Sequence, residues 1–198
     1  ILSSSGINNV QITEIEGNLT DYYDSKNKVL ALSKENYNSA SIASLGVTAH
    51  ECGHALQDYS NYFPMKFRNL VIKVYNISSK LLLPFIIIGF MFDFLLFIPT
   101  ISEVFIYSGI IVFGLSLISN LITLPVEFNA SKRALQILKE STILNNEETK
   151  GAKKVLNSAA LTYVAAFLYS LLNFLRFVII LTKTRTMRLY RLWWICAF

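Results

Sequence analysis

Three long apolar stretches constrain the fold of this chain more than any other feature. They cover residues 81–98, 104–124 and 159–181, with one charged residue in the first, none in the second and one in the third. Eighteen helical residues span about 27 Å, close to the thickness of the hydrocarbon core of a bilayer. Only 16% of the residues are charged, against about 25% in an average soluble domain. The sequence therefore predicts three membrane helices, and the short link 99–103 makes the first two a hairpin.

Lysine and arginine residues gather on both sides of this hairpin, whereas the link 99–103 has none. The positive-inside rule then places both flanks in the cytoplasm. The basic tail 184–198 would lie on the opposite side if the third stretch crosses completely, and this point stays open. The basic residues of the flanks are Lys66, Arg68, Lys73, Lys80, Lys132, Arg133, Lys139, Lys150, Lys153 and Lys154.

The net charge of +5 does not indicate a nucleic-acid-binding protein. The sequence has no basic groove pattern with interleaved aromatic residues, so we expect no nucleic acid partner. Its two cysteines, Cys52 and Cys196, lie too far apart in the sequence to form a disulfide framework. We expect Cys52 to be a packing residue.

The first 75 or so residues are typical of a soluble segment. Residues 10–15 and 29–32 are strand candidates, and the turn-forming residues between them favour a small antiparallel unit. The strand 29–32 could pair with an extended substrate backbone. Ser41 or Ser44 is expected to cap a helix that continues to about Tyr59.

That helix contains an H-E-x-x-H motif, from His50 to His54. Residues four positions apart share one helix face, so both imidazoles can reach one zinc ion. Glu51 lies beside the metal, where it can accept a proton from a bound water. These are the only two histidines in the chain. The alternative interpretation is two ordinary histidines on a soluble helix.

A catalytic zinc needs a third protein ligand, and with no other histidine it must be Asp, Glu or Cys. We predict Glu127, which follows the second apolar stretch, because the hairpin returns the chain to the side that holds His50. The alternative is a solvated glutamate favoured by the helix dipole. Pro125 could begin the helix that presents Glu127.

The H-E-x-x-H motif and the segment around Glu127 resemble those of the YugP-type neutral zinc metallopeptidases of bacterial membranes. That family is similar in layout to membrane gluzincins of the HtpX type, which combine H-E-x-x-H with a membrane hairpin and a glutamate in an E-x-x-A-D motif. The resemblance implies that His50, His54 and Glu127 bind Zn²⁺ and that Glu51 is the catalytic base. It runs from about residue 3 to residue 181, and its matching pieces are 46–57, 124–131, 133–135, 151–157 and 159–166.

Two positions depart from the expected pattern. Ser131 stands where the HtpX type has an aspartate, so the carboxylate that supports the metal site there is absent or supplied elsewhere. Tyr22 stands where the resemblance leads us to expect a histidine in a D-H-Y-D stretch. Tyr22, Tyr23 and Tyr163 are each candidates to donate a hydrogen bond to the oxyanion.

We therefore expect a mainly helical, integral membrane zincin-like metallopeptidase with a small antiparallel β unit. The function predicted is a zinc-dependent metalloendopeptidase that acts on peptides or membrane proteins at the cytoplasmic face of a bacterial membrane. Its partners would be this substrate and the lipid bilayer. The predicted parts are two segments of the peptidase domain (1–76 and 125–158), a transmembrane hairpin (77–124), a third membrane helix (159–183) and a basic tail (184–198).

Two alternative functions are set against this prediction. A zinc site within the bilayer is disfavoured, because the polar residues of segment 33–49 before the motif do not form a membrane span. A non-catalytic membrane scaffold with a vestigial or structural zinc site is the other alternative. Glu51 argues against it, because a structural site needs no base.

Overall fold

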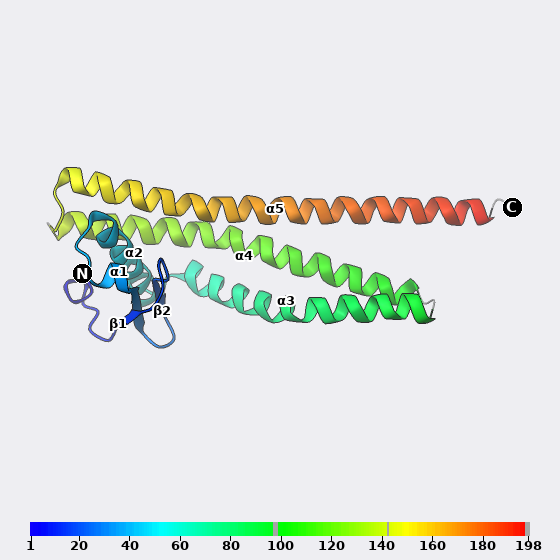
Figure 1. Cartoon of the computed structure of the whole chain (residues 1–198), viewed down its shortest axis with the longest axis horizontal. Helices are drawn as coiled ribbons and strands as arrows, with labels where there is room; N and C mark the ends of the chain where they lie inside the picture. The colour runs from blue at the N-terminus through cyan, green and yellow to red at the C-terminus, as the bar shows by residue number, and fades with distance from the viewer. Residues whose placement is uncertain (97–98, 142, 197–198) are drawn as a thin grey trace. The chain divides into compact units, whose positions relative to one another are not determined.

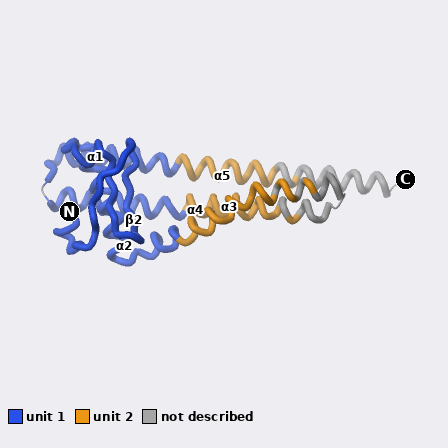
Figure 2. Tube along the Cα trace, turned by 60° about the horizontal axis from the view of Figure 1, so that its bottom comes forward, with its two compact units in different colours: residues 1–69, 122–164 blue, residues 70–121, 165–198 orange. Residues whose placement is uncertain are grey.

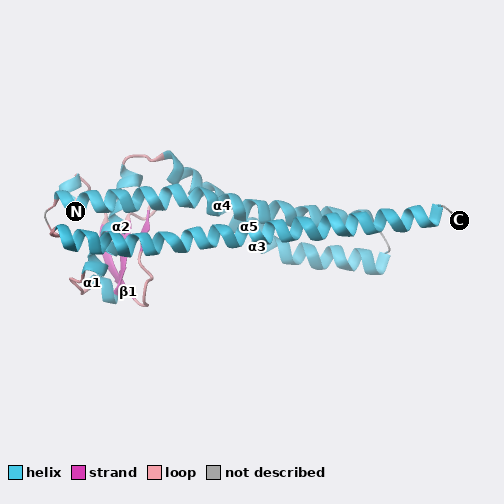
Figure 3. Ribbon diagram, turned by 90° about the horizontal axis from the view of Figure 1, so that it is seen from above, coloured by secondary structure: helices cyan, strands magenta, loops and turns pink. Residues whose placement is uncertain are grey.

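The computed structural model describes residues 1–96, 99–141 and 143–196 of the chain. Most of it is helical, and Figure 3 shows how little of the chain is strand. This confirms the predicted mainly helical fold with a small β unit. In chain order (Figure 1), the elements are the 3₁₀ turn Ser3–Ser5, β1 (Gln11–Ile15), β2 (Tyr22–Asp24), β3 (Val29–Ser33), α1 (Lys34–Tyr37), α2 (Ile42–Tyr59), α3 (Phe63–Leu96), α4 (Pro99–Glu140) and α5 (Asn146–Cys196).

The chain divides into two compact units (Figure 2). Unit 1 combines Ile1–Asn69 with Ile122–Val164, and unit 2 combines Leu70–Leu121 with the described residues from Ala165 onward. Unit 1 therefore contains the sheet, α2, and parts of both α4 and α5. Unit 1 also contains both the H-E-x-x-H motif and Glu127, although Glu127 follows His54 by 73 residues in the sequence.

The sheet has the strand order β1-β3-β2. An antiparallel pair is present, but it joins β2 to β3, whereas β1 runs parallel to β3. The expected antiparallel pairing of residues 10–15 with 29–32 was therefore wrong. The sequence between them contains the strand β2, and the tight turn that follows Asp24 returns the chain into β3 beside it, with the Asp24 carboxylate accepting hydrogen bonds from the backbone amides of Lys26 and Asn27.

This strand order also corrects the expectation for the substrate strand. β3 lies in the centre of the sheet, and its residues pair with β1 on one side and β2 on the other. A central strand has no free row of backbone groups to offer to a peptide. The outer strand that packs against α2 is β2.

The helix α2 begins as predicted at Ser41, whose hydroxyl accepts a hydrogen bond from the Ser44 amide at 3.1 Å. The cap satisfies one of the amides that the first turn leaves without a helical partner. Cys52 lies on the face that packs on the sheet and is 2% exposed, in a cluster with Leu30 and Leu32. Its predicted packing role is confirmed.

The helix α4 continues through Pro125 instead of beginning there. A proline inside a helix removes one backbone hydrogen bond, and the expectation of a new helix at this residue was wrong. Tertiary packing holds the segment after it: Val126, Ala130, Ala134 and Leu138, spaced four residues apart, are all 0% exposed. Spacing of four residues places them on one face of α4, and this face is buried in unit 1.

The backbones of α2 and α4 approach closely at Gly53. A Cβ added there would lie 2.5 Å from the carbonyl oxygen of Ala130 and 3.2 Å from its Cα. A methyl group does not fit at that distance, so the two helices would have to separate. The close contact is what allows side chains from α2 and α4 to meet around one point.

Gly53→Ala should therefore destabilise the protein by about 1–3 kcal/mol, the usual cost of overpacking. Gly46→Ala is the matched control in the same helix, because a Cβ there meets nothing nearer than 3.8 Å from Ala152. The control should be neutral or more stable by up to about 1 kcal/mol, since alanine favours helix over glycine. Unfolding of both variants by denaturant in detergent measures the difference, and equal stabilities would show that the helices are not in tight contact.

Two helical stretches of the described residues are long and apolar enough to cross a membrane: Tyr107–Glu140 and Asn146–Ile179, each 34 residues long. Length and composition alone support this, and these stretches overlap the second and third apolar stretches of the sequence. The first stretch, 81–98, ends at residues 97–98, which lie outside the described residues.

Candidate metal centre

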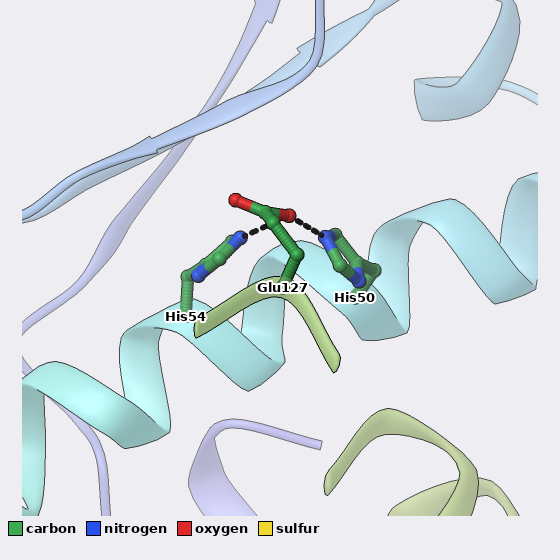
Figure 4. Close-up of side chains that lie close together, drawn as sticks. All are labelled: His50, His54 and Glu127. Carbon is green, nitrogen blue, oxygen red and sulfur yellow. Dashed lines mark hydrogen bonds and ion pairs between the residues drawn. The ribbon is translucent and has the colours of Figure 1, made fainter. Parts of the chain in front are cut away.

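Helix α2 carries both histidines of the motif, and α4 supplies the glutamate that lies between them (Figure 4). The Glu127 Oε2 atom is 3.1 Å from His50 Nε2 and 3.4 Å from His54 Nε2. The three side chains are largely buried, with exposed fractions of 12%, 9% and 5% for His50, His54 and Glu127. The structure thus brings together the three residues that the sequence predicts as ligands.

Two of the distances among these atoms match the spacing of ligand atoms around a zinc ion. Zinc bonds of about 2.0–2.1 Å at tetrahedral angles place neighbouring ligand atoms about 3.3–3.4 Å apart. The two contacts of Glu127 Oε2 agree with that spacing, and all three ligand atoms lie within 4.8 Å of one another. Three protein ligands leave a fourth position for water or substrate, as in catalytic zinc sites.

Each imidazole is also held at its outer nitrogen. His50 Nδ1 lies 3.1 Å from Ser131 Oγ, and His54 Nδ1 lies 3.0 Å from Gln57 Oε1. Such partners orient a histidine so that its Nε2 faces the metal. Ser131 therefore supplies an oxygen to His50 at the position where the resemblance to the HtpX type led us to expect an aspartate.

The two carboxylate oxygens of Glu127 have different partners, and Arg68 is the partner of one of them. Its Nη1 donates a hydrogen bond to Glu127 Oε1 at 2.8 Å, which leaves Oε2 for the histidines. Burial acts to raise the pKa of Glu127, but hydrogen bonds from His50 and His54 outweigh it and hold this pKa well below its usual range. The carboxylate is therefore charged and ready to bind a cation.

The same carboxylate shifts the pKa of His54 in the opposite direction. Burial acts to lower the pKa of His54, but the hydrogen bond and the negative charge of Glu127 outweigh burial, so that this pKa is raised. A divalent cation bound here would replace the proton as the positive partner of Glu127.

Glu51 lies next to His50 on α2 and is 8% exposed. Burial raises the pKa of its carboxyl group because the charged form loses its hydration; His54 and His50 act against this rise, and the charge of Glu127 adds to it. A carboxyl group whose pKa is raised toward neutrality is suited to taking up and releasing a proton during a reaction.

The structure separates the three candidate tyrosines. The hydroxyl of Tyr23 donates a hydrogen bond to Asp58 Oδ2 at 2.7 Å, and Tyr22 is 50% exposed on β2. Tyr163 of α5 instead interacts with the Glu127 carboxylate and the charge of Glu51. Of the three, Tyr163 is the one that the fold brings to the metal centre.

Cys52, although it lies within the motif, is no ligand candidate. Its side chain packs against Leu30 and Leu32 in the core between α2 and the sheet. Burial raises the pKa of the Cys52 thiol to about 11, whereas a zinc-binding cysteine is a thiolate.

Sequence reasoning missed Gln57 and Arg68. A signal for Gln57 was available, because it follows His54 by three residues and so lies on the same helix face. Arg68 offered no such signal, since its contact with Glu127 joins residues 59 apart in the sequence.

Comparisons with known proteins agree with this centre. Residues 1–182 match the family described as "Putative neutral zinc metallopeptidase". The chain is 41% identical over 185 residues to "Putative membrane protease YugP" of Bacillus subtilis (strain 168), an alignment that covers 93% of this chain and 79% of that protein. No solved structure matches the chain.

The predicted zinc cofactor is confirmed by the family and by a buried group of two histidines and one glutamate that can hold it. The predicted resemblance to YugP-type peptidases is confirmed as well. Because the match extends over nearly the whole chain, this protein belongs to the neutral zinc metallopeptidase family.

Proposed function

We propose that this protein is a gluzincin-type metalloendopeptidase that hydrolyses peptide bonds, with His50, His54 and Glu127 as zinc ligands and Glu51 as general base. The observation that carries the proposal is the position of Glu127 Oε2, at 3.1 and 3.4 Å from the two Nε2 atoms of the motif. A helix of the motif alone would offer only two ligands. Glu127, whose carboxylate pairs with Arg68, is the third ligand, and three protein ligands are the number found in catalytic zinc sites.

A zinc ion held by His50, His54 and Glu127 would supply the electrophile for the substrate carbonyl and would lower the pKa of water to about 7. The Glu51 carboxylate takes a proton from the water molecule whose oxygen attacks the carbonyl carbon. It then delivers that proton to the departing nitrogen as the C–N bond breaks. Tyr163 is placed to donate a hydrogen bond to the oxyanion, since its hydroxyl already interacts with Glu127 beside the ligand atoms.

The competing function, a scaffold with a structural zinc site, is less well supported. Structural zinc sites are closed by four protein ligands, whereas the cluster found among the described residues has three. Cys52, the nearest candidate for a fourth ligand by sequence, is packed in the core. Glu51, buried beside the ligands, is also unexplained by a purely structural role.

Hydrolysis of an unstructured peptide by the purified protein in detergent tests the proposed activity. We expect activity to disappear when a chelator removes the metal and to return with one equivalent of zinc. Undiminished activity in protein that elemental analysis shows to be free of metal would rule the proposal out.

We further propose that the protein is a multi-pass protein of the bacterial cytoplasmic membrane. Its hairpin 77–124 and its helix 159–183 would cross the bilayer, with the zinc site on the cytoplasmic side, where peptides or membrane proteins would be cleaved. The two apolar helical stretches, the basic flanks of the hairpin and the name of the relative, a membrane protease, support this.

Labelling of single cysteines in intact cells tests this topology. In a Cys196→Ser background, Lys150→Cys should react with a membrane-impermeant maleimide only after the membrane is disrupted. Ser102→Cys, in the link between the two arms of the hairpin, should react in intact cells. The reverse pattern would place the zinc site outside the cell.

A further inference from the structure

Gln57 is the most completely buried polar side chain near the metal centre. It lies on α2, one turn beyond His54, and is 0% exposed. Its Nε2 donates hydrogen bonds to the Val126 carbonyl oxygen at 2.8 Å and to Asn129 Oδ1 at 3.0 Å, both on α4. Its Oε1 lies 3.0 Å from His54 Nδ1. One side chain therefore joins a predicted zinc ligand on α2 to the backbone of the helix that carries Glu127.

The orientation of this amide is determined by partners whose roles are unambiguous. A backbone carbonyl only accepts hydrogen bonds, so the group of Gln57 that faces Val126 must be the NH₂. Arg133 only donates, and its Nε donates to Asn129 Oδ1 at 2.9 Å, which sets the orientation of the Asn129 amide as well. The guanidinium of Arg133 is itself held over the Tyr62 ring, 5.7 Å from its centroid.

With its NH₂ group facing α4, Gln57 can present only its carbonyl oxygen to His54. An oxygen acceptor requires a donor opposite, so Nδ1 of His54 must carry a hydrogen. An imidazole with one hydrogen at Nδ1 has its free electron pair at Nε2. Nε2 is the atom that faces Glu127 and the metal position.

We propose that Gln57 is a positioning residue that sets the tautomer of His54 for zinc binding, through the chain Arg133–Asn129–Gln57–His54. This inference rests on the zinc site of the proposed function. This hydrogen-bond chain joins His54 on α2 to the helix α4 that carries Glu127. His54 is therefore oriented for zinc only when α2 is packed on α4.

His50 provides an internal comparison. Its Nδ1 partner is the Ser131 hydroxyl, which can either donate or accept a hydrogen bond. Ser131 therefore does not select a tautomer of His50. The two histidines of the motif, which are equivalent by sequence, differ in this respect: Nδ1 of His54 must donate a hydrogen bond, whereas Nδ1 of His50 can donate or accept one.

Nitrogen-15 NMR of the full-length protein in detergent tests the proposal directly. The chain has two histidines, so ¹⁵N-histidine labelling gives two imidazoles, assigned with His50→Gln. In metal-free Glu127→Gln, which lacks the carboxylate that accepts a hydrogen bond from His54 Nε2, His54 should be entirely the Nδ1–H tautomer at a pH where the rings are neutral. A neutral His54 with its hydrogen at Nε2, or an equal mixture of tautomers, would overturn the proposal without any variant of Gln57.

Two variants then measure the effect on zinc affinity by competition with a chromophoric chelator. Gln57→Leu keeps the approximate volume but removes the acceptor, and its zinc affinity should fall about 10- to 100-fold, the usual cost of losing such a partner. Gln136→Leu, the same change at an exposed glutamine of α4, is the control, and its zinc affinity should equal that of wild type. When Gln57→Leu is combined with Glu127→Gln, His54 of the metal-free protein should show both tautomers.

The outcomes separate this inference from the proposed function. Zinc added to wild-type protein should shift both imidazole signals, and absence of this shift would sink the zinc site itself. If zinc shifts both signals but Gln57→Leu binds zinc as tightly as wild type, only the role of Gln57 is wrong. Circular dichroism of each variant establishes that the protein is folded when affinity is measured.

Discussion

Replacing Glu51 by glutamine should abolish peptide hydrolysis and leave zinc bound. Glutamine has the same shape as glutamate but cannot accept the proton of the attacking water. Loss of a general base costs about 10²–10⁴ in rate. Glu51 is not one of the three residues whose ligand atoms cluster, so the zinc content should remain at one per chain. Peptide cleavage and elemental analysis of the same preparation measure both quantities.

The same variant should not destabilise the fold. Burial raises the pKa of Glu51, so in the metal-free protein the charged form stabilises the folded state less than the protonated form does. Stability from this group is present at low pH and is lost as pH rises through the folded pKa. Glutamine stays neutral, and Glu51→Gln in its metal-free form should be at least as stable as wild type at neutral pH.

Glu35→Gln is the matched control, since Glu35 is exposed on α1. It removes the same charge and should retain full activity. If Glu51→Gln kept more than a tenth of wild-type activity with zinc bound, another group would have to be the base. If it lost its zinc, Glu51 would be part of the ligand set instead.

Glu127→Gln should reduce zinc affinity by more than about 100-fold. Losing a residue that merely supports a ligand costs about 10- to 100-fold, and Glu127 is predicted to be a ligand itself. The change also removes the negative charge that two imidazoles and Arg68 now share. Zinc competition with a chelator measures the affinity, and peptidase activity at limiting zinc should fall with it.

Glu140→Gln, on an exposed turn at the end of the same helix, is the control for the loss of one carboxylate. Its zinc affinity should equal that of wild type. A Glu127→Gln variant that binds zinc normally would show that the third ligand is another residue. Glutamine is preferred to alanine at this position because alanine would also leave a cavity beside the partly buried Arg68 side chain.

Local sequence pattern was enough to predict the parts that depend on neighbouring residues. The four-residue spacing of His50 and His54 places both on one face of any helix, and the Ser41 cap marks where that helix begins. The packing of Cys52 follows from its position on another face of α2. The length of the apolar stretches predicts long helices whatever the details of their packing.

Pairing of distant segments was less predictable. The parallel alignment of β1 with β3 depends on a short strand, β2, that resembles a turn by composition. The continuation of α4 through Pro125 depends on the buried face of residues beyond it, which outweighs one lost backbone hydrogen bond. In both cases long-range packing overrode a correct local preference.

The sequence by itself determined which residues of α2 could carry out the proposed chemistry, because a helix repeats every 3.6 residues and so places two imidazoles on one face with a carboxyl group beside them. Only the tertiary structure decided how that chemistry is supported. Arg68 on Glu127, Ser131 on His50 and the Gln57 contact with Val126 join residues 59 to 81 positions apart. These contacts exist because α2 approaches α4 backbone to backbone at Gly53, a distance that no local pattern specifies.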